Sequence, residues 1–151
     1  MSKFVDLPPV WLGLFAALAW GQSRLLPMNM FGTFGDVAGG VLVVAGIGLA
    51  LLAVREFARA RTTVIPHQQP SALVSSGIFR LSRNPIYLGD AFILLGLVLW
   101  WDAVLSLVLV PAFMALIQAR FIRAEEARLE AAFPEAFADY SARVARWFGR
   151  Q

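Results

Sequence analysis

The chain has 151 residues, of which 59% are hydrophobic and 15% are charged, and it contains no cysteine. This length suits one domain, so we treat residues 1–151 as a single unit. Such a low share of charged residues is untypical of a water-soluble domain of this size. The absence of cysteine excludes disulfides, zinc–thiolate sites and cysteine nucleophiles.

Long apolar runs occupy most of the first 122 residues. About 20 residues of helix cross a hydrocarbon core, with roughly 17 as the short limit. Backbone polar groups in lipid must be paired within the segment, which a helix achieves by itself. The runs therefore predict an all-α integral membrane protein with about four transmembrane helices, over residues 9–27, 36–58, 85–101 and 102–132.

Polar residues and prolines predict where these helices begin. Asp36 is expected to cap the second helix. Asn84 followed by Pro85 matches a capping residue followed by proline at the first helical position. Asp102 is expected to cap the fourth helix after a tight turn, and Pro111 to kink that helix.

Arginine is concentrated in residues 55–83 and in the tail from residue 120, whereas the turns 28–36 and 101–102 carry none. Cytoplasmic loops are enriched in arginine and lysine. We therefore place both termini and the long middle loop in the cytoplasm, with a bacterial inner membrane as the expected location. The net charge of +3 then reflects topology and anionic lipid rather than nucleic-acid binding. We also expect no ionisable side chain near the middle of a helix, which argues against a transporter.

The tail after the fourth run is amphipathic. Pro134 interrupts the pattern, so we expect a separate helix over residues 134–147. Glu135 near its start and Arg146 near its end suit the helix dipole. We expect this helix to lie at the membrane surface with its apolar face toward lipid. The apolar positions recur at a spacing of three or four residues and are Leu129, Phe133, Phe137, Tyr140, Val144 and Trp147.

Two polar segments, residues 62–90 and 123–144, carry the candidate chemistry. The first is an unusually long loop between membrane helices, and long loops are often functional. Over roughly residues 40–148 the chain resembles the isoprenylcysteine carboxyl methyltransferase and phospholipid methyltransferase superfamily of integral membrane enzymes. The matching residues are Leu73-Val74, Gly77-Ile78-Phe79, Arg83-Asn84-Pro85, Tyr87, Gly89, Glu125-Glu126, Leu129, Phe133, Tyr140 and Val144.

The resemblance implies S-adenosylmethionine as the methyl donor and a lipophilic acceptor that enters from the bilayer. It places the cofactor at the cytoplasmic face, between the loop, the start of the third helix and the acidic pair. Two positions depart from the family pattern. Asn84 stands where many members have histidine, which weakens assignment to the eukaryotic isoprenylcysteine subgroup, and Pro134 stands where glycine is usual. The implied cofactor contacts are Ser71, Ala72, Leu73, Val74, Phe79, Asn84, Pro85, Ile86, Tyr87 and Glu125.

The chemistry of individual residues points to the same pocket. A helix start offers free backbone amides to an anion such as the donor's carboxylate, and Arg83 adds a cation with bidentate geometry. Glu125 or Glu126 can bind the donor's ammonium or ribose hydroxyls, with Glu125 preferred. Phe79 and Tyr87 can pack on adenine or face the sulfonium. Arg83 and Glu125 are the predicted catalytic residues.

Each assignment has a simpler alternative. Arg83 can merely follow the bias of arginine toward cytoplasmic loops, and Glu125-Glu126 can be a solvated helix face paired with a neighbouring arginine. His67 is either solvent-exposed or a cofactor contact. As the one histidine in a chain without cysteine, it has no partner with which to complete a metal site. Arg120 either extends to the lipid interface or contacts an acidic substrate.

We therefore expect methyl transfer from S-adenosylmethionine to an acceptor that partitions into the membrane. An isoprenylcysteine-like carboxylate or thiol is favoured, followed by a phospholipid amine and then a small hydrophobic molecule. A carboxylate or thiolate needs no general base, whereas an amine must lose a proton. The non-enzymatic alternative is a membrane scaffold that retains the fold.

Overall fold

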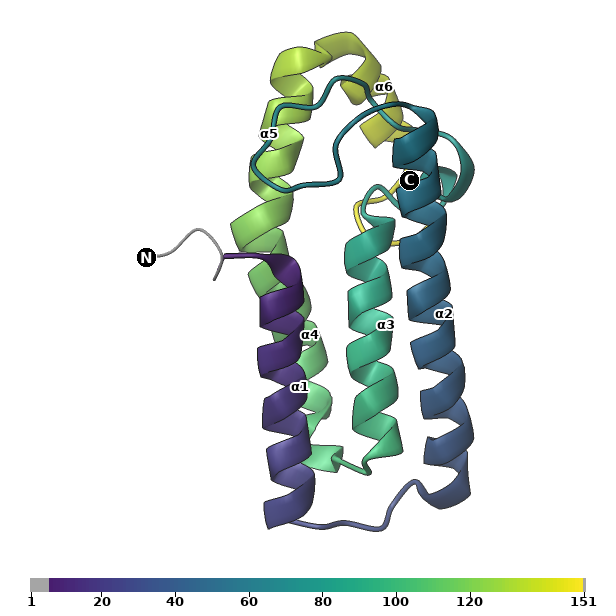
Figure 1. Cartoon of the computed structure of the whole chain (residues 1–151), viewed down its shortest axis with the longest axis vertical. Coiled ribbons are helices and arrows are strands. Elements are labelled where there is room, and N and C mark those ends of the chain that lie inside the picture. The colour runs from purple at the N-terminus through teal and green to yellow at the C-terminus, as the bar shows by residue number, and fades with distance from the viewer. Residues whose placement is uncertain (1–5, 151) are drawn as a thin grey trace.

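The computed structural model describes residues 6–150, so residues 1–5 and 151 of the predicted domain lie outside the described range. Helices dominate this range, which confirms the predicted all-α class (Figure 1). The elements are α1 (Pro8–Leu25), α2 (Gly32–Arg59), a 3₁₀ turn (Gly77–Arg80), α3 (Pro85–Trp100), a second 3₁₀ turn (Val104–Val108), α4 (Leu109–Ile117), a π-helical turn (Gln118–Ile122), α5 (Arg123–Ala132) and α6 (Pro134–Arg143).

The long helices run side by side, with α5 continuing the line of α4 beyond the others (Figure 1). The loop after α2, helix α6 and the C-terminal segment gather at the end of the bundle where α3 begins (Figure 1). The short connections α1–α2 and α3–α4 lie at the opposite end (Figure 1). The arrangement therefore brings both polar segments of the sequence to one end of the bundle.

Two helical segments are long and apolar enough to cross a membrane, namely α2 and the uninterrupted column Val104–Ala132, and α3 is a shorter apolar helix. Only 17% of the most apolar window of α2 is buried inside the protein, so most of its apolar surface faces outward. Water-soluble monomers rarely expose so large an apolar area, whereas lipid accommodates it. The exposed stripe consists of Phe34, Val37, Val41, Val44, Ile47 and Leu51.

Helices α2 and α3 pack backbone against backbone through glycine. A Cβ atom on Gly39 would lie 2.5 Å from the carbonyl oxygen of Gly96. A Cβ atom on Gly89 would lie 2.5 Å from the carbonyl oxygen of Gly46. Both distances are too short for any side chain, so glycine is what allows the two helices to approach this closely.

Both aspartates predicted to cap helices behave differently. α2 begins at Gly32, before Asp36, which lies exposed inside the helix. The carboxylate of Asp102 accepts hydrogen bonds from the backbone N–H groups of Met30 and Phe31 at 3.0 to 3.3 Å. Asp102 therefore satisfies free amides at the start of α2 rather than at the fourth helix. The Asp36 prediction was wrong because α2 begins earlier, at Gly32. The Asp102 prediction was wrong because the turns that precede α2 and follow α3 meet in space.

The fourth helical column is less regular than predicted. Its first turn, Val104–Val108, is 3₁₀, and Pro111 follows in the first turn of α4, where a missing N–H costs little. A π-helical turn, Gln118–Ile122, then joins α4 to α5. Because a π turn adds a residue to the helical turn, it changes the face that α5 presents to the rest of the bundle. No residue pattern in this stretch had indicated the π turn.

Helix α6 ends at Arg143, short of the predicted boundary, and its apolar face packs on protein instead of lipid. Phe137 and Tyr140 are buried in a cluster with Val74 and Phe79. The hydroxyl of Tyr140 donates a hydrogen bond to the carbonyl oxygen of Phe79 at 2.7 Å, and burial raises the pKa of Tyr140 above its ordinary value. The prediction that this face lies on the membrane is therefore wrong, because the long loop covers it.

The glycine contact yields a matched pair of substitutions on α2. Gly39→Val places its branched side chain against the backbone of α3, whereas a Cβ atom on Gly48 would meet no neighbouring element within 4 Å. We expect Gly39→Val to destabilise the fold by about 1–3 kcal/mol, the usual cost of overpacking. Gly48→Val should unfold like the parent. Thermal unfolding in detergent measures both, and equal melting temperatures for the two variants would contradict this close packing of α2 on α3.

Candidate active site

A cavity of about 560 Å³ lies at the end of the bundle where α3 begins. Its walls come from the start of α1, the end of α2, the loop 63–74, the first turns of α3 and the α5–α6 segment. This volume is within the range of roughly 300–1,000 Å³ typical of small-molecule sites. The predicted cofactor contacts that line it are His67, Ala72, Leu73, Val74, Phe79, Arg83, Asn84, Pro85, Ile86, Tyr87, Glu125 and Glu126.

Ser71 is the predicted contact that does not line the cavity. Its backbone N–H donates a hydrogen bond to Thr62 Oγ1, and its hydroxyl donates to the carbonyl oxygen of Arg61, both at 3.1 Å. These bonds join the two ends of the loop, so Ser71 shapes the loop from outside. His67 does line the cavity, with a backbone φ of +68° and its ring centroid 5.9 Å from that of Phe121, although its side chain is exposed.

Arg83 is held at the cavity wall by an ion-pair network. Its Nη1 lies 3.1 Å from Oε1 of Glu126, and Arg146 binds the same carboxylate through Nε and Nη2 at 2.9 and 2.7 Å. The hydrogen bond to Glu126 raises the pKa of Arg146. Within residues 6–150, the Nε atom of Arg83 is buried and has no hydrogen-bond partner. Glu126 is thus neutralised by two guanidinium groups, while Arg83 keeps one donor unused.

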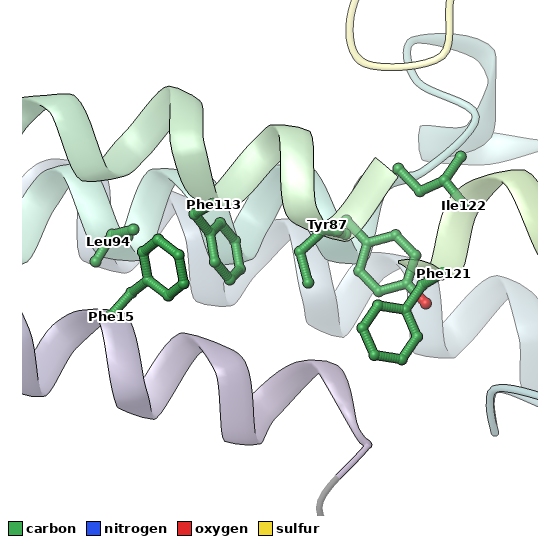
Figure 2. Packing of buried hydrophobic residues seen from close by; sticks show 7 residues of the cluster. Phe15, Tyr87, Leu94, Phe113, Phe121 and Ile122 are labelled. Carbon is green, nitrogen blue, oxygen red and sulfur yellow. The ribbon is translucent and has the colours of Figure 1, made fainter. Parts of the chain in front are cut away.

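Tyr87 and Glu125 form a second pair of interacting polar groups at the cavity. The hydroxyl of Tyr87 donates a hydrogen bond to Oε1 of Glu125 at 2.6 Å. Figure 2 shows the Tyr87 ring beside Phe121, within the packed core that continues along the bundle to Phe15 and Phe113. The ring therefore belongs to the core, and its hydroxyl lies at the edge of that core. Both members of the pair line the cavity.

Arg128 was not predicted as a site residue, yet it also lines the cavity. Its Nη1 atom is buried and lacks a hydrogen-bond partner among the described residues. A buried donor without a partner costs free energy unless a ligand or water satisfies it. Arg83 and Arg128 therefore place two guanidinium groups on the cavity wall.

The start of α3 is bound to the C-terminal segment. The side-chain amide of Asn84 donates to the carbonyl oxygen of Arg146 at 2.9 Å instead of capping the helix. The backbone N–H of Arg83 donates to the carbonyl oxygen of Ala145 at 3.1 Å. Pro85 occupies the first helical position, as predicted, and no side chain of the described range caps α3. The first-turn amides of α3 are therefore available to a ligand.

Glu56 anchors the far end of the loop, a role that was not predicted from the sequence. It is 8% exposed, accepts a hydrogen bond from the hydroxyl of Ser76 at 2.6 Å and pairs with Arg59 at 3.3 Å. Gly77 follows with a φ of +57°, and a Cβ atom there would lie 2.7 Å from the Glu56 carboxyl group. Glycine is needed at this position for both its conformation and its size.

Asp90 is a second acidic residue that was not predicted as part of the site. It lies on α3, is 9% exposed and lines the cavity. The sequence did carry a signal, because Asp90 is the one charged residue between Pro85 and Trp101, and charges in apolar helices are usually functional. Our expectation that no ionisable side chain lies well inside a helix has to be corrected at this position.

Arg120, the predicted substrate contact, does not line the cavity. It pairs with Asp6, and its guanidinium lies 5.4 Å from the centre of the Trp11 ring. The hydrogen bond from Arg120 lowers the pKa of Asp6. The structure therefore gives Arg120 a contact with the segment that precedes and begins α1.

Comparison with known proteins identifies the family of the chain. The sequence model of the family described as phospholipid methyltransferase matches residues 34–136. The chain belongs to the phospholipid methyltransferase family. No curated protein and no solved structure matches the chain. Membership makes the chain a membrane enzyme that uses S-adenosylmethionine, within the superfamily that the sequence motifs indicated, and this displaces the scaffold alternative.

The cavity fits the cofactor that phospholipid methyltransferases use. S-adenosylmethionine has a carboxylate, an ammonium group, ribose hydroxyls and an apolar adenine ring. The unpaired guanidinium donors and the uncapped start of α3 suit the carboxylate. The Glu125 carboxylate suits the ammonium or the hydroxyls. Leu73, Val74 and Phe79 offer an apolar wall for the ring.

The shared carboxylate of Glu126 leads to a stability prediction. Glu126→Gln leaves the half-buried guanidinium groups of Arg83 and Arg146 without their counter-charge. We expect a loss of about 2 kcal/mol in the free energy of unfolding, because an uncompensated buried charge is costly. Glu130→Gln, on the exposed side of the same helix, is the control. If both variants unfold together with the parent, the network contributes nothing to stability.

Proposed function

We propose that this cavity binds S-adenosylmethionine and transfers its methyl group to a lipophilic acceptor taken from the bilayer. One observation supports this most directly: the same cavity is lined by charged groups, including Arg83 and Glu125, and by apolar side chains from the end of α2 and the loop, including Val54, Phe57 and Leu73. In such a space a polar donor can meet a lipid acceptor. The donor does not have to enter the lipid, and the acceptor does not have to enter water.

The donor is proposed to lie against the loop and the start of α3. Arg83 and the first-turn amides of α3 hold the carboxylate. Glu125, fixed by the hydroxyl of Tyr87, holds the ammonium or the ribose. When bound, S-adenosylmethionine supplies a methyl group on a positively charged sulfur. The protein residues align the reactants and exclude water, which are the main requirements of an in-line displacement.

Glu126 is proposed to act through Arg83 rather than on the donor directly. Its two oxygens are both engaged, by Arg83 and by Arg146. It therefore fixes the orientation of Arg83 at the wall. This arrangement favours Glu125 over Glu126 as the acidic contact to the donor.

We propose that α1, α2, α3 and the Val104–Ala132 column all cross the membrane. The turns opposite the cavity, residues 26–31 and 101–103, contain no arginine, whereas Arg55, Arg59, Arg61 and Arg80 lie near the cavity end. By the positive-inside rule, the cavity then opens to the cytoplasm, where the donor is made. A bacterial inner membrane remains the proposed location.

Two acceptor classes are proposed. An isoprenylcysteine-like carboxylate or thiol agrees with the wider superfamily, and the description of the matched family favours a lipid acceptor such as a phospholipid amine. Either enters through the apolar part of the cavity. They differ in charge and in the need to lose a proton, so the charge of the cavity wall distinguishes them.

Donor binding can be tested with S-adenosylhomocysteine, the product of methyl transfer, by isothermal titration of the detergent-purified protein. We expect Arg83→Ala and Glu125→Gln each to weaken binding at least tenfold, about 1.4 kcal/mol. Glu125→Gln keeps a partner for Tyr87, so its effect reports charge rather than misfolding. Arg80→Ala and Glu130→Ala, both at exposed positions, serve as matched controls.

Two results would count against the donor site. If the folded parent does not bind at millimolar S-adenosylhomocysteine, the cavity is not a donor site. If the parent binds and both cavity variants bind equally well, the donor lies elsewhere in the protein.

The acceptor class can be tested on total membrane extract with radiolabelled S-adenosylmethionine. Methyl esters release labelled methanol in mild base, whereas N-methyl groups are stable. Base-labile label would identify a carboxylate acceptor, and base-stable label that migrates with phospholipid would identify an amine. Label in neither fraction, from protein that binds S-adenosylhomocysteine, would exclude both a carboxylate and a phospholipid amine as the acceptor.

A further inference from the structure

Asp90 occupies the inner end of the cavity. It lies three residues after Tyr87, so both side chains share one face of α3, and both line the cavity. At 1.5 Å of rise per residue, Asp90 is about 7.5 Å along the helix from Pro85. The polar groups on this wall thus follow an order, from Arg83 at the bundle end, past Tyr87, to Asp90 among the apolar helices.

Asp90 differs from the other buried or half-buried acids in lacking a partner. Glu56 has Ser76 and Arg59, Glu125 has Tyr87, and Glu126 has two arginines. No hydrogen bond or ion pair from residues 6–150 reaches the carboxylate of Asp90, which is 9% exposed. An unpaired buried acid is costly, so its position on a cavity wall points to a ligand that satisfies it.

The chemistry of a carboxylate defines that ligand. An ionised carboxylate accepts hydrogen bonds and attracts positive charge, and an alkylammonium group offers three N–H donors. A carboxylate acceptor would instead meet a like charge in a region of low dielectric. The groups proposed to hold the donor, Arg83 and Glu125, lie nearer the bundle end. Asp90 therefore faces the space left for the acceptor.

We propose that Asp90 binds the ammonium group of a lipid amine acceptor and accepts one of its protons. The inference rests on the proposed function and assigns a residue to its acceptor half. It also selects the amine class over the carboxylate class.

The proton transfer gives a balanced reaction. The ammonium N–H bond breaks, the proton moves to a carboxylate oxygen of Asp90, and the electron pair stays on nitrogen. That pair forms the new N–C bond to the donor methyl group, while the C–S bond breaks and its electrons remain on sulfur as S-adenosylhomocysteine. The methylated amine leaves as a cation, and Asp90 returns its proton to water.

The test uses the full chain in nanodiscs of dioleoylphosphatidylcholine with or without dioleoylphosphatidylethanolamine. Asp90→Asn keeps the shape and removes the charge, and Asp90→Glu restores the charge. Asp36→Asn, an exposed acid on α2, is the control. Three quantities are measured: S-adenosylhomocysteine affinity by calorimetry, retention of phosphatidylethanolamine by native mass spectrometry, and kcat for methyl transfer.

We expect Asp90→Asn to bind S-adenosylhomocysteine within twofold of the parent, to retain phosphatidylethanolamine at least tenfold more weakly, and to lose roughly 100-fold in kcat, the lower end of general-base effects. Asp90→Glu should recover part of both losses, and Asp36→Asn should match the parent. Asp90→Ser, also neutral, is measured in parallel and takes the place of Asp90→Asn if that variant does not fold.

Three outcomes would overturn the role of Asp90. In the first, folded Asp90→Asn or Asp90→Ser retains phosphatidylethanolamine and transfers methyl like the parent. In the second, that variant loses S-adenosylhomocysteine binding, which would assign Asp90 to the donor. In the third, the parent methylates the carboxylate acceptor N-acetyl-S-farnesylcysteine and no amine lipid. Failure of the proposed function itself looks different, because the parent then does not bind S-adenosylhomocysteine.

Discussion

The close contact between α2 and α3 determines the geometry of the whole cavity end. Glycines on both helices let one backbone touch the other, so the two helices lie as close together as their backbones allow. The end of α2 and the start of α3 consequently emerge next to each other. Because the end of α2 and the start of α3 are close together, the intervening residues 60–84 do not have to bridge a gap between them. They fold over the bundle end instead (Figure 1). Glu56, at the end of α2, then binds Ser76 in the returning loop. Residues 6–150 thus form this cavity by themselves.

The polar groups around the cavity fall into two sets. One set is satisfied within the protein: Glu126 with its two arginines, and Asn84 with the C-terminal backbone. The other set retains unused capacity, namely single N–H groups of Arg83 and Arg128 and the carboxylate of Asp90. Arg83 belongs to both sets, because its Nη1 is paired and its Nε is not. We propose that the first set fixes positions within the site and that the second set contacts ligands.

Local signals in the sequence were sufficient for most of the architecture. The apolar runs predicted the helices, and Pro85 and Pro134 marked two helix starts correctly because proline acts within its own turn. Contacts between distant segments could not be read in this way. Asp102 precedes one helix in the chain yet lies beside the start of another in space.

The same limit separates the site residues that were predicted from those that were missed. Family motifs brought the loop, Arg83 and Glu125 together, and the structure places all of them on one cavity, with Ser71 outside it. Arg128 belongs to no recognised motif, and only the fold reveals that its Nη1 lacks a hydrogen-bond partner among the described residues. Asp90 is a different case, because a lone acid in an apolar run is a signal that the sequence itself carries.

The C-terminal segment has a consequence for how the enzyme is made. Its backbone carbonyl groups hold Arg83 and Asn84, and its Arg146 completes the pairing of Glu126. A ribosome produces this segment after α1 to α6 have been synthesised. The membrane bundle can therefore assemble during translation, but the wall that carries Arg83 is complete only once residues 144–150 have emerged. A nascent chain that lacks these residues would then sit in the membrane with its helices in place and this cavity wall unfinished.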